Sequence, residues 1–125
     1  MESQAKIHIQ RLILENKLEL VVSYVSRFEN IANPYITRRD AINNFFSKAK
    51  FYIDYNFSEN IEKHAESIME SGIKEKDALH IACTIEGKCQ YLITTDDRGL
   101  KYSSLKIKIC NPIDFLRELE GIEDA

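Results

Sequence analysis

The stretch Asp77–Asp97, which reads DALHIACTIEGKCQYLITTDD, decides the fold of this 125-residue chain. It begins with an acid, continues as an apolar helical segment that Gly87 closes, and then runs through a short apolar strand into Asp96 and Asp97. Helix entrances and the carboxyl ends of strands are where α/β proteins gather their sites, because both face the crevice at one edge of the sheet. The stretch therefore predicts an α/β fold with a cluster of carboxylates.

The composition predicts one globular domain that covers residues 1–125. A hydrophobic content of 44% suits a modest core, and no shift in composition marks a second unit. The formal net charge of -3 argues against a broad basic face that could hold nucleic acid by charge alone. Any contact with nucleic acid must therefore be local.

The cysteines and the N-terminal segment predict a soluble, cytoplasmic protein. Cys83, Cys89 and Cys110 form neither a paired zinc-ligand spacing nor an even disulfide framework, so we interpret them as reduced thiols, with Cys83 in the core. The first residues, ESQAKIHIQ, lack the basic and then apolar pattern of a signal peptide. No apolar run approaches the ~20 residues that a membrane span needs.

Helical and strand patterns alternate along the rest of the chain. A helix is predicted over 3–16, a strand over 18–22, and a second helix that Ser23 caps and that ends before Pro34. This second helix is expected to turn four apolar side chains inward, namely Tyr24, Val25, Phe28 and Ile31. Thr37 and Asp40 resemble a capping box at the start of a third helix.

The second half of the chain continues the alternation. Residues 51–57 are compatible with a short or edge strand, and a helix from 58 ends near Gly72, which suits a left-handed position. A strand at 106–110 and a last helix that starts at Asn111-Pro112 follow the deciding stretch. Such alternation predicts an α/β domain with a mainly parallel sheet joined by right-handed crossovers.

Each acid also has an ordinary structural interpretation. Asp77 alone is more often a helix-start acid that complements free backbone N–H groups, and Asp96 with Asp97 could form a polar turn. Glu29 alone is a typical solvated charge, and His80 a partly buried histidine rather than a metal ligand. The combination favours a site, because converging carboxylates repel each other unless a cation lies between them. Magnesium or manganese with a phosphate substrate suits such a set of oxygen ligands.

The sequence also resembles the PIN-domain ribonucleases, particularly the short VapC-like toxins of prokaryotic toxin–antitoxin pairs. The most specific motifs are Asp77-Ala-Leu-His-Ile-Ala, the strand YLITTDD and the closing Ile109-Cys110-Asn111-Pro112, and SYVSRFENIANP is similar to the Ser-then-Glu helix of the family. The resemblance implies a three-layer α/β/α fold with a short, mainly parallel sheet. It covers almost the whole chain.

The resemblance implies a metal-dependent endoribonuclease that cleaves RNA phosphodiester bonds, the toxin of a type II toxin–antitoxin pair. Glu29, Asp77 and Asp96 would be catalytic acids that bind Mg or Mn, with Asp97 as an auxiliary metal ligand. Ser23 and Thr94 would support them, and the phosphates of the RNA would lie near a basic set made of Arg38, Arg39, Arg98 and Lys101. The implied partners are RNA, an antitoxin protein and a second copy in a dimer.

The sequence departs from the family at its beginning. The family pattern opens with a strand that carries the first catalytic Asp, whereas this sequence opens directly on the first helix, so we expect a PIN-like domain that is incomplete at the N-terminus and has three ligand carboxylates instead of four. Residues 18–22 and 91–94 are then expected to pair with each other, directly or across a dimer. Alternatives to the nuclease are a degenerate, non-catalytic module that binds RNA or a partner protein, and a structural remnant.

Overall fold

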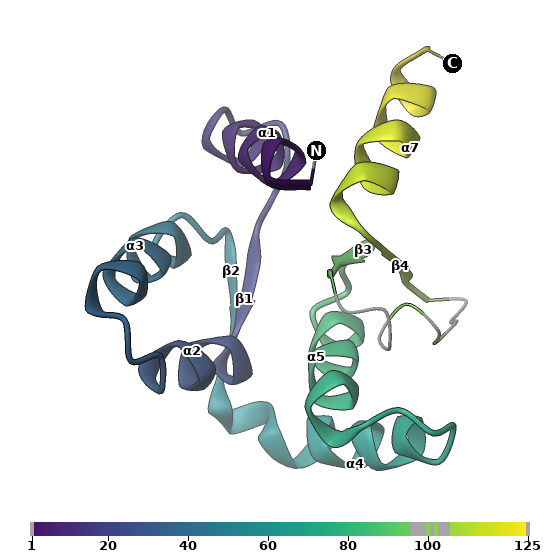
Figure 1. The fold of residues 1–125 in the computed structure, drawn as a ribbon. Coiled ribbons are helices and arrows are strands. Elements are labelled where there is room, and N and C mark those ends of the chain that lie inside the picture. Colours follow the sequence, from purple (N-terminus) through teal and green to yellow (C-terminus); the bar gives the residue numbers. More distant parts are fainter. Residues whose placement is uncertain (1, 96–99, 101, 103–105, 125) are drawn as a thin grey trace.

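The computed structural model describes residues 2–95, 100, 102 and 106–124. It is a mixed α/β structure in which most of the residues in regular elements are helical and the strands are short (Figure 1). In chain order the described elements are α1 (Glu2–Leu14), β1 (Val21–Ser23), α2 (Tyr24–Ile31), α3 (Ile36–Phe46), β2 (Phe51–Ile53), the 3-10 turn η1 (Tyr55–Phe57), α4 (Ser58–Met69), α5 (Glu75–Glu86), β3 (Tyr91–Ile93), β4 (Lys108–Cys110) and α7 (Pro112–Asp124).

The strands form two separate parallel pairs within the described part of the chain. β1 pairs with β2 in the register Val22 to Tyr52, and β3 pairs with β4 in the register Leu92 to Ile109. In Figure 1 the strands follow one another across the molecule in the order β2, β1, β3, β4. The expected direct pairing of residues 18–22 with 91–94 within one chain is therefore wrong, because among the described strands β1 bonds to β2 and β3 bonds to β4.

The hydrogen bonds between β3 and β4 show which edge of β3 is paired. The Gln90 carbonyl accepts from Lys108 N–H at 3.0 Å, and Thr94 N–H donates to the Cys110 carbonyl at 3.0 Å. Since alternate residues of a strand direct their backbone groups to opposite sides, Tyr91 and Ile93 turn their N–H and C=O groups away from β4. The edge of β3 that lies toward β1 is thus the one without a ladder among the described elements.

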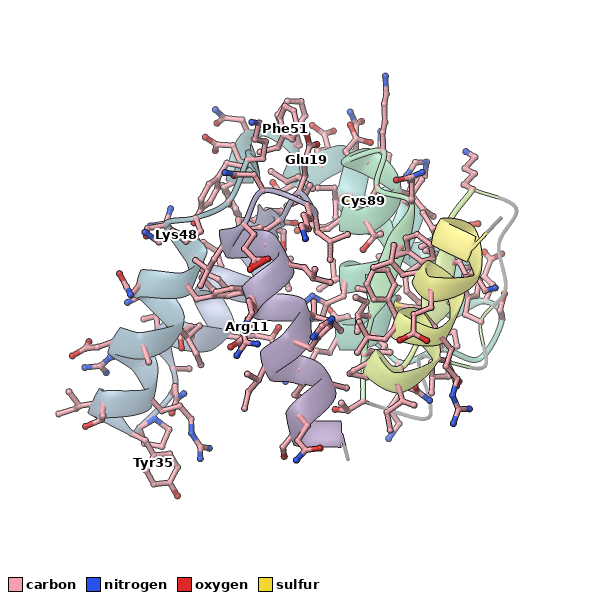
Figure 2. The ribbon with its side chains drawn as sticks, turned by 90° about the horizontal axis from the view of Figure 1, so that it is seen from above. Arg11, Glu19, Tyr35, Lys48, Phe51 and Cys89 are labelled. Atoms are coloured by element: carbon pink, nitrogen blue, oxygen red, sulfur yellow. The ribbon has the colours of Figure 1, made fainter. Side chains whose placement is uncertain are left out.

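One core connects the two strand pairs through α4 and α5. Ile61, Ile68 and Ile81 lie in the same buried cluster as Ile53 of β2, and Leu92 of β3 packs against it. A smaller cluster on the other side joins Ile9 of α1 to residues of β4 and α7, namely Cys110 and Phe115. The ribbon seen from above places α1 between the α3 side of the molecule and α7 (Figure 2).

Two details of the N-terminal half differ from the sequence-based expectation. Phe28 and Ile31 of α2 are exposed rather than inward, while Asn30 is buried and donates to the Arg39 carbonyl and to Asn43 Oδ1. Thr37 lies inside α3 and caps nothing, because the helix already begins at Ile36. Elsewhere the order of helices and strands is as predicted, but some bounds differ. The strand expected at 18–22 lies at Val21–Ser23, and residues 51–57 form β2 and then η1 in place of one strand.

The described helices include none that is long and apolar enough to cross a membrane.

Candidate active site

The junction of α2 and α5 brings one of the predicted acids, Glu29, together with two basic side chains. Glu29 of α2 binds Lys76 of α5, with 2.8 Å between Glu29 Oε2 and Lys76 Nζ. Its other oxygen, Oε1, contacts His80 Nε2 one turn further along α5. Glu29 and His80 are each about two-thirds covered, at 34% and 27% side-chain exposure, so the contact is partly shielded from water. The carboxylate is therefore already neutralised by residues of this chain.

Ser23 places α2 at this junction. It is buried at the end of β1, and its Oγ accepts a hydrogen bond from the Ser26 N–H at 3.3 Å, which makes it the N-cap of α2. The Ser23 side chain also opposes the rise in the pKa of the Cys83 thiol of α5. The predicted cap is confirmed.

Asp77 lies in the first turn of α5 beside Glu75, where a negative charge complements the helix dipole. It is half-buried, and no hydrogen bond or ion pair joins it to another residue of the described ranges. The residue before the helix, Lys74, makes no side-chain cap. Of the predicted acids that the structure describes, Asp77 is thus the one whose oxygens are not occupied by the protein.

The other predicted site residues lie elsewhere or outside the described part. Thr94 is half-buried at the carboxyl end of β3, the position expected of it, but β3 belongs to a different strand pair from β1. The Arg38 guanidinium lies over the Tyr35 ring, 5.6 Å from its centroid, and the Arg39 carbonyl accepts a hydrogen bond from the Asn30 side chain. Four further predictions fall outside the described residues, namely Asp96, Asp97, Arg98 and Lys101.

A magnesium or manganese site is not completed by the described residues alone. Among them no group of three His, Cys, Asp or Glu side chains is close enough to hold a metal ion. Glu29 would have to release Lys76 and His80 before it could bind a cation. The donors that the structure describes therefore do not by themselves fit a divalent metal.

Lys76 is the site residue that sequence reasoning missed. The spacing of Lys76 and His80 places both on one stripe of α5, which is visible in the sequence. That Glu29 reaches this stripe depends on how α2 packs against α5, and no local pattern reports such a long-range contact. His80 matches the interpretation of a partly buried, partnered histidine.

Cys83 behind the junction is a core thiol, as predicted. Burial raises its pKa to about 11, Glu86 adds to the rise, and the hydrogen bond with Ser23 opposes it. Burial also raises the pKa of Tyr24 to about 12, with smaller contributions from Cys83, Glu62 and Tyr55. Both groups are therefore neutral in the folded protein at physiological pH.

These two raised pKa values predict a loss of stability at alkaline pH. The folded state holds both groups neutral while the unfolded chain ionises them, so stability is complete below about pH 9 and falls as the pH rises toward 12. Urea unfolding between pH 7 and 11 should show a falling midpoint. A Cys83→Ala variant should show a shallower fall between pH 9 and 11, and an equally steep one would contradict this assignment.

Comparison with known proteins adds no relative, since no protein-family model, no curated protein and no solved structure matches this chain.

Proposed function

We propose that this chain is a PIN-like, metal-dependent endoribonuclease, the toxin of a toxin–antitoxin pair. The observation that carries the proposal is the junction of α2 and α5, where Glu29 binds Lys76, the residue before Asp77 in the first turn of α5. The family motifs in the sequence imply acids at these two positions. The implied partners are RNA, an antitoxin protein and a second copy of the chain.

The proposal needs Asp96 and Asp97 to complete the metal site, because the described donors do not suffice. A bound magnesium or manganese ion would supply an activated water and stabilise charge on the leaving oxygen. The residues of this chain would hold the site: Asp77 offers a half-buried carboxylate that no other described residue binds, and Ser23 caps the helix that carries Glu29. Lys76 and His80 would have to exchange Glu29 for the RNA phosphate or for solvent.

A second candidate function is a non-catalytic PIN-like module that binds RNA or a partner protein. It is favoured by the neutralised state of Glu29, which two cationic or hydrogen-bonding side chains hold in place. In such a module the junction would be a structural link between α2 and α5. Metal affinity would then be weak, and substitution of the acids would leave partner binding unchanged.

Cleavage of a structured RNA by the purified chain separates the two candidates. We expect cleavage with manganese or magnesium, none with EDTA, and none from the Asp96→Asn variant. Circular dichroism checks that chain and variant are folded alike. A folded chain that leaves the RNA intact with either metal would reject the nuclease and favour the binding module.

A further inference from the structure

Lys76 is the exposed partner in the contact that holds Glu29. Its side chain is 71% exposed, while the side chain of His80, the second partner, is 27% exposed. An exposed ion pair contributes little to stability, because water solvates both charges and a flexible lysine loses side-chain entropy when it is held. Lys76 Nζ, at 2.8 Å from Glu29 Oε2, can therefore exchange with another cation more readily than His80 can leave Oε1.

The two partners lie on turns of α5 that differ in burial. The turn that carries His80 is anchored in the core, since Ile81 is 1% exposed and the buried Thr84 donates to the His80 carbonyl at 2.8 Å. One turn earlier, Lys76 and its neighbour Glu75 are exposed. The helix thus presents one fixed and one movable side chain to the same carboxylate.

Lys76 also lies among acids at the start of α5. Glu75 precedes it and Asp77 follows it in the first turn of the helix, and Glu29 joins them from α2. Carboxylates that gather in one place disfavour each other's charged form, and a positive charge among them relieves this repulsion. The ammonium group of Lys76 therefore supplies to Glu29 the charge that a bound cation would otherwise supply.

We propose that Lys76 is an internal competitor of divalent cations at Glu29. Its ammonium group binds the carboxylate in the metal-free chain and has to leave before a metal ion can approach the same oxygen. The inference rests on the proposed function, and it starts from the disagreement between that function and a carboxylate that the chain itself already occupies. The metal concentration that the chain needs is then higher with Lys76 than without it. A purely structural tie between α2 and α5 is the competing role of the same pair.

The proposal is tested by titration of the purified chain with manganese in the absence of RNA, with free Mn²⁺ measured by electron paramagnetic resonance. Lys76→Met keeps most of the stem and removes the charge, and we expect it to tighten manganese binding by about 5-fold, the upper end of what an exposed ion pair contributes. Lys76→Arg keeps the charge and should keep the weaker affinity of the wild type.

Lys74→Met is the matched control for net charge. Lys74 is exposed and directly precedes α5, and residues two apart do not face each other on a helix. Its substitution removes one positive charge from the same end of α5 and should leave manganese affinity within about 2-fold of wild type. An increase as large as that of Lys76→Met would assign the effect to net charge and overturn the proposal.

The remaining outcomes distinguish this proposal from the function on which it rests. Tighter manganese binding by Lys76→Met in a chain that never cuts RNA would keep the competition and reject the nuclease. Metal-dependent cleavage by the wild type, with equal manganese affinities in wild type and Lys76→Met, would keep the nuclease and overturn the competition. A lower thermal midpoint of Lys76→Met with unchanged manganese affinity would assign the pair to the structural tie. Absence of manganese binding in both chains would overturn both proposals.

Discussion

Exchange of Asp77 for asparagine is expected to lower metal-dependent RNA cleavage by at least about 100-fold. The substitution keeps the size and the first-turn position of the side chain in α5 but removes the charge that a cation requires. No hydrogen bond or ion pair joins Asp77 to another residue of the described ranges, so its charge is available to a metal. The measurement is the initial cleavage rate over a manganese titration.

Glu75→Gln is the control for this experiment. Glu75 lies in the same first turn of α5 and is exposed, so its replacement makes the same change in the charge near the helix start. It should leave cleavage within about 2-fold of wild type, because screened surface charges contribute little. Equal losses in the two variants would show that Asp77 acts through the helix dipole and not as a ligand.

Ile81→Ala is expected to destabilise the protein by about 2–5 kcal/mol. Ile81 is 1% exposed and lies in the cluster against which both strand pairs pack, so the truncation leaves a cavity in the shared core. The thermal midpoint should fall by roughly 10 °C or more for a domain of this size. Ile7→Ala removes the same atoms from an exposed position on α1 and should stay within about 0.5 kcal/mol of wild type. Similar losses in both would mean that α5 is not the core helix.

The predictions for α5 and for its neighbours were correct because each residue pattern there had a single interpretation. The segment that starts near Asp77 is apolar on most of its circumference, and only a well-buried helix suits such a pattern. Gly72 was expected in a left-handed position and has a φ of 94°. The strand expected at 91–94 is found at Tyr91–Ile93.

The inward face of α2 could not be predicted from its period. Helical spacing correctly places Tyr24, Val25 and Phe28 on neighbouring parts of the helix, but it does not say which parts another element covers. Tyr24 and Val25 are covered, whereas Phe28 stays exposed beside Tyr55. Burial of Asn30 depends on two hydrogen-bond acceptors in α3 that lie 9 and 13 residues away. A local sequence pattern cannot predict such long-range partners.

The start of α3 was misplaced for a local reason. Asn33 Oδ1 accepts a hydrogen bond from the Tyr35 N–H at 3.0 Å, and this turn around Pro34 leads the chain into the helix at Ile36. Thr37 is therefore already a helical residue when the capping pattern would need it outside the helix. An Asx turn and a capping box compete for the same short stretch, and here the turn comes first.

The contacts of the candidate site could be predicted only in part. Glu29 lies against α5, the helix that carries Asp77 in its first turn, but its contacts with Lys76 and His80 could not be predicted from the sequence. Asp96 and Asp97 lie outside the described residues, so the convergence of all three acids stays a prediction. Long-range ion pairs depend on packing angles between helices, which are set by the whole core and not by any segment.

Because the strands form two separate pairs, their backbone amides should exchange with solvent deuterium in two independent groups. Each pair holds a ladder of three residues on each strand, so local opening of β1–β2 needs no opening of β3–β4. The amides of α5 lie over the cluster shared by both pairs, and they are released when the whole domain unfolds. Strand amides should therefore label first, in two independent groups, while α5 retains its protons until global unfolding. In this protein the slow-exchanging centre is a helix and not the sheet.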